Sequence, residues 1–311
     1  PPPLAGGGSG PRLQRKGNGR LMICNLCPRH CGAERLPDKA GGVCAMPAWP
    51  VAARAMLHQW EEPCLVGSHG AGAVFFSGCN LRCKFCQNGI ISQEGYGKPI
   101  TPGRLREIFC ELVEAGASCL DLVTPTQFTD SVLEALGDTP WPVPVVWNCG
   151  GYESVETLRR LEGRVQVYLP DFKYALSAPA REYSAAVDYP EIAEAAILEM
   201  FRQTGPYKEE NGQLKSGVLI RHLVLPGELE NTKAVIDWVS GTFRPGDVLF
   251  SLMSQYTPQP GAVGKLARRL TPAEYRAAER YMADCGISNG FTQERTSAKE
   301  EYTPDFHLQG I

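Results

Sequence analysis

Three cysteines, Cys79, Cys83 and Cys86, lie within eight residues of one another in the segment GCNLRCKFCQN (78–88). Three thiolates on one short loop can bind three irons of a cubane iron–sulfur cluster and leave the fourth iron open. An open iron can bind a substrate, as the open position of a catalytic zinc does. Disulfides fit an acidic chain without a recognisable secretory signal poorly, and a structural zinc would need a fourth ligand close by. The spacing therefore predicts a [4Fe–4S] cluster.

A second group of cysteines precedes this triplet. Cys24, Cys27, Cys31 and Cys44 place four thiols within about twenty residues, a spacing typical of a metal site. The segment that contains them has so little apolar sequence that it could hardly fold without a bound metal. Zinc and a second Fe–S cluster both fit four cysteines, and ligand softness does not decide between them. The cluster assembly that the triplet requires favours the second Fe–S cluster.

The chain from about residue 71 onward contains the elements that must position these cysteines. Short apolar runs predict strands at residues 73–77, 120–124, 143–147, 165–169, 218–225 and 248–252. Helical patterns lie between and after them, near residues 102–115, 129–136, 154–161, 192–202 and 232–239 and from 271. Buried parallel strands are apolar throughout, and helical crossovers separate them. This order predicts an α/β fold, a partial (β/α)6 TIM-like barrel or open arc, with functional residues at the C-terminal ends of its strands.

The composition excludes several classes of function. The chain has 311 residues, of which 43% are hydrophobic and 21% charged, as in globular proteins with a sizeable core. No apolar run reaches the roughly 18 residues that a membrane span needs, so no membrane partner is expected. The net charge is −3, and it becomes −7 when the four basic residues of the first twenty are removed. An acidic chain argues against nucleic acid as a partner.

The sequence divides into four parts. Residues 1–20 contain no acidic residue and little to bury, which indicates a flexible tail, a cloning scar or a propeptide remnant. Residues 21–70 form a cysteine-rich metal-binding segment with little regular periodicity, and residues 71–260 form the barrel. Residues 261–311 are expected to be a C-terminal helical extension, whose helix has Pro272 in its first turn and Gly286 beyond its end.

The triplet segment resembles the signature of radical S-adenosylmethionine (SAM) enzymes, including the aromatic Phe85 directly before the last cysteine. The resemblance implies that Cys79, Cys83 and Cys86 bind a [4Fe–4S] cluster whose open iron binds SAM. Phe85 and Gln87 would then lie beside the adenine. It also implies a partial (β/α)6 barrel and the reductive cleavage of SAM to methionine and a 5′-deoxyadenosyl radical, which abstracts a hydrogen atom.

Most of residues 24–311 resembles one group of that superfamily, the homologues of pyruvate formate-lyase-activating enzyme that carry an N-terminal cysteine block. Matching stretches are EEPC (61–64), LVTPT (122–126), GGYES (150–154), YLPDFKY (168–174), RHLVLPG (221–227) and SLMSQYTP (251–258). This resemblance implies the activation of a glycyl-radical enzyme. Auxiliary clusters are frequent in the superfamily, which again favours Fe–S over zinc at the four N-terminal cysteines.

Residues near the ends of the second and third expected strands are candidates for SAM binding. Thr124 and Thr126 stand where related enzymes carry a Gly-Gly-Glu motif that meets the SAM amino group, and their hydroxyls could replace it. The alternative is a simple turn that ends the strand. Asn148 begins the stretch NCGGY, which resembles the Asp-Thr-Asn-Gly stretch of the activating enzymes.

The later strands supply further candidates. Lys173 could bind the SAM carboxylate with Asp171 holding it in place, although an ordinary ion pair at a strand end is the alternative. Arg221 matches an arginine of the activating enzymes and could bind the carboxylate through two hydrogen bonds. His222 points to the opposite face of the same strand and is expected to be packed or hydrogen-bonded. Gln255 lies where these enzymes place a residue that contacts the ribose.

The sequence thus predicts a cytoplasmic radical SAM oxidoreductase in which no catalytic residue is assigned beyond the cluster and SAM. A flavodoxin or ferredoxin would donate the electron, and a glycyl-radical enzyme would donate the hydrogen atom. Modification of a small molecule or peptide is the alternative within radical SAM chemistry. A non-catalytic zinc-binding scaffold is the alternative from another class, since both cysteine groups could hold zinc.

Overall fold

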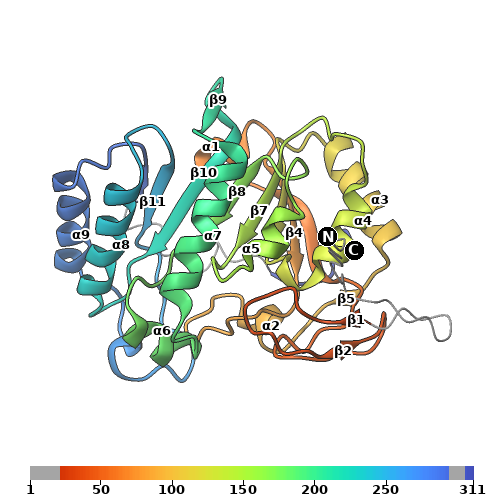
Figure 1. Ribbon diagram of the computed structural model, residues 1–311, viewed down its shortest axis with the longest axis horizontal. Helices are drawn as coiled ribbons and strands as arrows, with labels where there is room; N and C mark the ends of the chain where they lie inside the picture. The colour runs from red at the N-terminus through yellow and green to blue at the C-terminus, as the bar shows by residue number, and fades with distance from the viewer. Residues whose placement is uncertain (1–21, 294–304) are drawn as a thin grey trace, which may run out of the picture.

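A central β-sheet carries the helices of this protein, as a computed structural model of residues 22–293 and 305–311 shows (Figure 1). The tail predicted for residues 1–20 lies outside the described residues. The strands are β1 (Met22–Ile23), β2 (Glu34–Arg35), β3 (Val51–His58), β4 (Ala71–Phe76), β5 (Lys98–Pro99), β6 (Leu120–Val123), β7 (Val145–Cys149), β8 (Val167–Pro170), β9 (Lys208–Glu210), β10 (Gln213–Leu223), β11 (Leu249–Met253) and β12 (Gly290–Thr292).

The α-helices connect these strands and lie mainly on one side of the sheet (Figure 1). They are α1 (Pro63–Val66), α2 (Gly89–Ser92), α3 (Pro102–Glu114), α4 (Thr129–Leu136), α5 (Val155–Arg159), α6 (Ser177–Ser184), α7 (Tyr189–Thr204), α8 (Leu229–Thr242) and α9 (Pro272–Asp284). Two short 3-10 helices, η1 (Thr126–Phe128) and η2 (Gly264–Ala267), complete the described elements.

The main sheet has the strand order β12-β11-β10-β8-β7-β6-β4-β3-β5, and β9 pairs with β10 as a hairpin. All neighbours from β4 to β12 are parallel, whereas β3 is antiparallel to β4. The six predicted strands correspond to β4, β6, β7, β8, β10 and β11, and they lie side by side in chain order. The mixed α/β fold with a central sheet is therefore as predicted, while its closure into a partial barrel stays a prediction.

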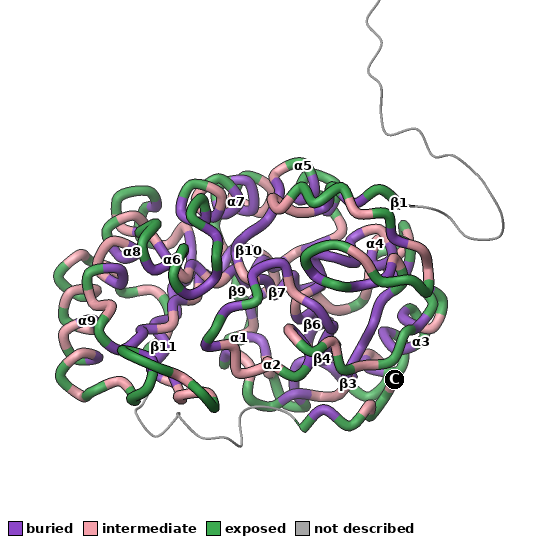
Figure 2. The backbone as a smooth tube through the Cα atoms, turned by 90° about the horizontal axis from the view of Figure 1, so that it is seen from below, coloured by how far each residue is buried: buried purple, intermediate pink, exposed green. Residues whose placement is uncertain are grey.

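The parallel strands are buried on both faces, which explains why their sequences are apolar throughout. On one face, Val74, Trp147 and Ile220 belong to the large core that packs against the helices. On the other face, Val146 and Leu219 belong to a smaller core that also includes Leu65 of α1. Figure 2 shows the strands as a largely buried layer, with the helices, whose residues range from buried to exposed, outside it.

The segment of residues 21–70 contains a regular element that the sequence did not predict. Residues 51–58 form β3, which pairs with β4 over nearly its whole length. The run VAARAMLH lacks alternation and is rich in alanine, which favours helix in isolation, so only the neighbouring strand makes it a strand. As a unit of the fold, the cysteine-rich segment therefore ends near residue 50.

The C-terminal segment contains more than the predicted helical extension. The helix itself is confirmed as α9, which begins after the capping residue Thr271 and is followed by Gly286 in the left-handed conformation. Beyond it, β12 adds a strand parallel to β11. Residues 305–311 lie beside β3, where the backbone N–H of Leu308 donates to the carbonyl of Ala53. The extension is thus corrected to a helix, an edge strand and a return along β3.

The elements that the sequence did not predict also include the hairpin strand β9 and helix α6. The hairpin of β9 and β10 turns at Asn211-Gly212, both with positive φ, which is the strongest short hairpin signal in a sequence. Helix α6 lies between the predicted units and carries Ser184 at its end. In β7, by contrast, the strand begins two residues later than predicted, because Pro142 and Pro144 cannot donate to the sheet.

The strand β12 depends on a glycine that no other residue can replace. A Cβ at Gly290 would collide with the backbone carbonyl of Phe250, and the φ of Gly290 is +142°. We expect Gly290→Ala to lower the free energy of unfolding by about 1–3 kcal/mol. The matched substitution Gly103→Ala, in helix α3 with no atom nearer than 3.7 Å, should change it by less than about 1 kcal/mol. Urea unfolding of both variants measures the difference, and equal effects would contradict the assigned pairing of β12.

Candidate active site

The triplet loop, residues 77–88, leaves the sheet directly after β4, at the C-terminal edge of the parallel strands. Cys83 is buried, and Cys79 and Cys86 are partly buried. Each sulfur accepts a hydrogen bond. The donors are the backbone N–H of Leu81 to Cys79 at 3.4 Å, the Ser184 hydroxyl to Cys83 at 3.0 Å and the Ser92 hydroxyl to Cys86 at 3.2 Å. Hydrogen bonds to sulfur adjust the reduction potential of iron–sulfur clusters, so this environment suits a cluster.

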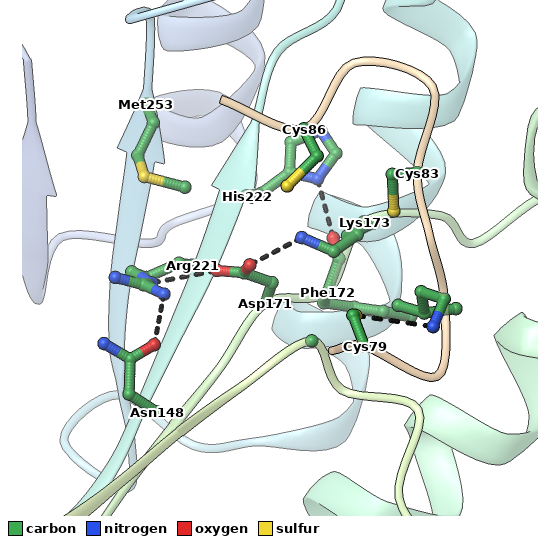
Figure 3. Close-up of polar contacts among 12 residues, drawn as sticks. Cys79, Cys83, Cys86, Asn148, Asp171, Phe172, Lys173, Arg221, His222 and Met253 are labelled. Atoms are coloured by element: carbon green, nitrogen blue, oxygen red, sulfur yellow. Dashed lines mark hydrogen bonds and ion pairs between the residues drawn. The ribbon is translucent and has the colours of Figure 1, made fainter. Parts of the chain in front are cut away.

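Lys173 lies beside the triplet, and its charged amino group is close to the sulfurs of Cys83 and Cys86. Its Nζ donates to Oδ2 of Asp171 at 2.6 Å, and less than a fifth of either side chain is exposed. Burial alone would lower the pKa of Lys173, but Asp171 and the neighbouring thiols of Cys83 and Cys86 raise it above the ordinary value. Figure 3 shows Lys173 between these cysteines and the ion pair of Asp171. The lysine therefore stays charged next to the sulfurs.

Arg221 extends this ion pair across the sheet. Its guanidinium donates to Oδ1 of Asp171 at 2.9 Å, to Oε1 of Glu61 at 3.1 Å and to Oδ1 of Asn148 at 2.7 Å. The Asn148 amide in turn donates to Oε2 of Glu61 at 3.1 Å. The structure thus brings four predicted site residues, Asn148, Asp171, Lys173 and Arg221, into one network (Figure 3). All three nitrogens of the Arg221 guanidinium thus already donate hydrogen bonds to protein acceptors.

The network contains more acidic than basic groups. Besides Asp171 and Glu61, it includes Asp121, which accepts from Asn148 at 3.4 Å, and Glu62. Burial and repulsion by Glu61 raise the pKa of Asp121 well above its ordinary value. Burial raises the pKa of Glu62 to about 7, against the opposing attraction of Arg221. Protons on these two carboxyls leave two anions opposite the two cations, which balances the buried charge.

Glu61 and Glu62 are the site residues that the sequence did not assign. In the sequence, EEPC (61–64) stands out only as one of the stretches that match the activating-enzyme homologues. Both side chains are largely buried, because α1 packs against β10 and carries the preceding residues into the interior. The feature that could have indicated these residues is a pair of acidic residues directly before a proline that starts a helix. Whether their side chains point into the interior depends on how that helix packs.

The remaining SAM candidates lie in three different environments. The Gln87 amide donates to the backbone carbonyl of Gln255 at 3.0 Å, so these two predicted residues are together. Phe85 is buried edge-on against two tyrosines, Tyr174 and Tyr183, at ring separations of 6.4 and 6.3 Å. The ring of Phe85 thus already packs against two aromatic side chains of the protein.

The turn after β6 directs its two threonines differently. Thr124 has a φ of +60°, a strained conformation for a β-branched residue, and its N–H donates to the carbonyl of Asn148. Thr126 is buried and donates to Oε1 of Glu153 at 2.6 Å. The Thr126 hydroxyl is therefore engaged by a carboxylate from the loop after β7. On β10, His222 packs as predicted, with Nδ1 against the carbonyl of Phe172 and burial lowering its pKa to about 4.

The four N-terminal cysteines gather in the segment of residues 22–50, here called the cysteine block. Cys24 and Cys44 are buried, Cys27 is half-buried and Cys31 is exposed. Burial raises the pKa of Cys27 to about 12, and the charges of Cys24 and Cys44 act in the same direction. In residues 22–293 and 305–311, no three His, Cys, Asp or Glu side chains approach closely enough to hold one metal ion together.

The donor chemistry of both cysteine groups fits a metal–thiolate site. Burial raises the pKa of Cys83 to about 12, so this thiol needs a cation such as iron to bind as a thiolate. In a cluster the cysteines bind different irons, and they need not converge on one point. Within the block, Arg35 is fully buried, and its Nε and Nη2 have no partner within the described chain. An anionic metal–thiolate centre would supply the missing counter-charge.

The sequence has a relative in an archaeon. The uncharacterized protein MJ0674 of Methanocaldococcus jannaschii is 31% identical to this chain over 277 residues, which cover 84% of this chain and 75% of that protein. The chain belongs to the family of MJ0674. No protein-family profile matches the sequence. Among the described residues, no helix is both long and apolar enough to cross a membrane.

Similarity to solved structures is weak. Two crystal structures of SuiB from Streptococcus suis, one of them bound to S-adenosylmethionine, superpose with TM-scores of 0.46 and 0.47 at 11% sequence identity. They overlap 70% of this chain, which spans about half the length of SuiB. An overlap of this size says nothing about what this chain binds.

The buried carboxyl of Glu62 makes stability depend on pH. Because its pKa is about 7 in the folded protein and near 4.5 in the unfolded chain, the folded state alone binds its proton between these values. The free energy of unfolding should therefore fall by about 3 kcal/mol as the pH rises from 4.5 through 7. In Glu62→Gln this contribution is absent, while Glu153, with a similarly raised pKa, titrates in both proteins and cancels in the comparison.

Anaerobic urea unfolding of the wild type and Glu62→Gln at pH 5 and pH 8 measures this dependence. The variant should lose about 3 kcal/mol less than the wild type between the two pH values. Parallel changes in the two proteins would contradict the burial of an ionisable carboxyl at this position.

Proposed function

We propose that this protein is a radical SAM enzyme whose Cys79, Cys83 and Cys86 bind a [4Fe–4S] cluster. The observation that carries the proposal is the position of the triplet loop, directly after β4, the first of the parallel strands, and beside the charged network of Lys173 and Arg221. When bound, the cluster would supply the electron that cleaves SAM to methionine and a 5′-deoxyadenosyl radical. The partial (β/α)6 barrel belongs to the same proposal, which the chain-order arrangement of the strands supports.

The chain's own residues would bind and orient SAM. Lys173 offers a charged donor next to the sulfurs, and Asp171 holds it by a 2.6 Å hydrogen bond. Arg221 and Asn148 offer polar groups from β10 and β7, the two strands that flank β8. The arginine could bind the SAM carboxylate only by exchanging an existing acceptor, so we assign it first to holding Asp171. Gln87 and Gln255 are the candidates for the nucleoside end, because they lie together after the triplet and after β11.

The substrate is proposed at the level of its class. Activation of a glycyl-radical enzyme follows from the resemblance of the sequence to the activating enzymes, with flavodoxin or ferredoxin as electron donor. Modification of a small molecule or peptide is the second candidate, favoured by the departure at Thr124 and Thr126, where Thr126 is already bonded to Glu153. The cytoplasm is the compartment that suits an oxygen-sensitive cluster and reduced thiols.

The cleavage of SAM tests the proposal. After anaerobic reconstitution with iron and sulfide and reduction with dithionite, the wild type should release 5′-deoxyadenosine from SAM. Cys83→Ala should reduce this release to background, because the cluster loses one of three ligands. Cys110→Ala is the matched control, since Cys110 is exposed on α3, and it should retain wild-type release. A reconstituted wild type that forms no 5′-deoxyadenosine would overturn the proposed function.

For the cysteine block we propose a second Fe–S cluster on Cys24, Cys27, Cys31 and Cys44. If this cluster is also of the [4Fe–4S] type, anaerobically purified protein should contain about eight irons per chain and show the visible absorbance of Fe–S clusters. About four irons with one zinc would assign a structural zinc to the block instead. Zinc at both sites, with no iron and no colour, would favour the non-catalytic scaffold over the enzyme.

A further inference from the structure

One arginine of the cysteine block reaches into the candidate active site. Arg29 donates from Nε to the carbonyl of Asn80 at 2.8 Å, from Nη1 to that of Ala185 at 2.7 Å and from Nη2 to that of Ser184 at 3.0 Å. Its guanidinium also lies 5.1 Å from the centre of the Tyr152 ring. All three nitrogens of a rigid planar group are thus used on backbone acceptors, which fixes the spacing of the segments that carry them.

These acceptors belong to the surroundings of the triplet thiols. Asn80 directly follows Cys79, and its side-chain amide donates to the carbonyl of Tyr152 at 2.8 Å. Ser184 supplies the hydroxyl that donates to the sulfur of Cys83 at 3.0 Å. Arg29 therefore connects the first cysteine of the triplet to the hydrogen-bond donor of the second.

The same contacts continue toward the candidate SAM-binding residues. Tyr152 stacks on Tyr189 with the ring centres 6.0 Å apart and the planes at 8°. The Tyr189 hydroxyl donates to the carbonyl of Asp171 at 2.5 Å and accepts from the N–H of Lys173 at 2.9 Å. The segment from Asp171 to Lys173 is thus positioned from the side on which Arg29 packs.

The cysteine block also touches the triplet loop directly. A Cβ at Gly78 would lie 2.9 Å from the carbonyl oxygen of Cys44 and even closer to the side chain of Met46. Gly78 has a φ of +78°, and it immediately precedes Cys79. The block therefore packs against the start of the triplet loop at Gly78, with no room there for a side chain.

Little regular structure holds Arg29 in place within its own segment. It lies between Cys27 and Cys31, in a turn where the N–H of His30 donates to the carbonyl of Cys27. Only the two-residue strands β1 and β2 precede and follow this turn. A metal bound by Cys27 and Cys31 would fix the turn from both sides, as metal sites do in short segments with small cores.

We propose that the cysteine block is the positioning element of the active site: metal binding by the block fixes Arg29, and Arg29 holds the triplet loop in the geometry that binds SAM. The inference rests on the proposed function, and Arg29 acts through backbone carbonyls without touching substrate. Loss of Arg29 should therefore affect the environment of the triplet and the affinity for SAM more strongly than it affects the stability of the fold.

Arg29→Ala and Arg29→Lys test this role, with Arg164→Ala as the matched control, because Arg164 lies in the loop after α5 and pairs there with Asp138. After anaerobic reconstitution, three properties are compared: the EPR spectrum of the reduced protein with and without SAM, the KM for SAM against kcat for 5′-deoxyadenosine release, and hydrogen exchange of residues 77–88. Arg29→Ala should raise KM about tenfold or more, since it removes three hydrogen bonds from a charged donor.

The same variant should alter the EPR spectrum with SAM and speed exchange of residues 77–88, at unchanged iron content of the block. Arg29→Lys keeps the charge but can reach fewer of the three acceptors, so its effects should be intermediate. Cys31→Ser, which disturbs metal binding at an exposed ligand, should reproduce the spectral change and the faster exchange. Arg164→Ala should match the wild type in every measurement.

The outcomes separate this inference from the proposed function. If the wild type releases 5′-deoxyadenosine while both Arg29 variants match Arg164→Ala in KM, spectrum and exchange, the positioning role is wrong and the enzyme assignment stands. If Arg29→Ala alters the loop but Cys31→Ser leaves it unchanged, the block's metal is not what fixes Arg29. A wild type without SAM cleavage overturns the function on which both depend.

Discussion

The carboxylate of Asp171 lies between two cations, and much of the candidate site depends on that arrangement. One oxygen accepts from Lys173 and the other from Arg221, so a single side chain sets the positions of both charges. Burial alone would raise the pKa of Asp171, but the two cations lower it below the ordinary value. The carboxylate therefore stays charged, and Lys173 is directed toward the cysteines because its partner cannot move away from Arg221.

The parallel sheet makes this arrangement possible. Asp171 follows β8, Arg221 lies near the end of β10, and the two residues form an isolated parallel bridge. The N–H of Phe172 donates to the carbonyl of Arg221 at 2.7 Å, so the backbone continues the sheet beyond the end of β8. From the opposite end, Glu61 reaches the same arginine because α1 packs into the interior against β10. The site thus forms where the ends of the strands β8 and β10 meet the buried carboxylate of Glu61.

The features that could be predicted from the sequence are those that neighbouring residues determine. The triplet, the tetrad of cysteines and the six apolar strands depend on local spacing and composition. Four of the proposed polar residues lie near or just beyond the C-terminal ends of strands that were placed to within a few positions. Such positions converge in any parallel sheet, which is why Asn148, Asp171, Lys173 and Arg221 could be grouped in advance.

The remaining features depend on contacts between distant parts of the chain. Arg29 bonds to Ala185, 156 residues away, and Glu61 bonds to Arg221, 160 residues away. Neither contact leaves a signal in the local sequence, because an arginine between cysteines and a glutamate before a proline are equally compatible with exposed positions. Strand β3 was missed for the same reason, since its alanine-rich sequence becomes a strand only beside β4.

We propose that a cluster on Cys79, Cys83 and Cys86 binds SAM at an open iron next to Lys173. The most direct test is electron–nuclear double resonance of the reduced protein with SAM that carries ¹⁵N in its amino group. We expect a hyperfine coupling between that nitrogen and the cluster, present in the wild type and absent in Cys83→Ala. A reduced cluster that shows no coupling to bound SAM would contradict it.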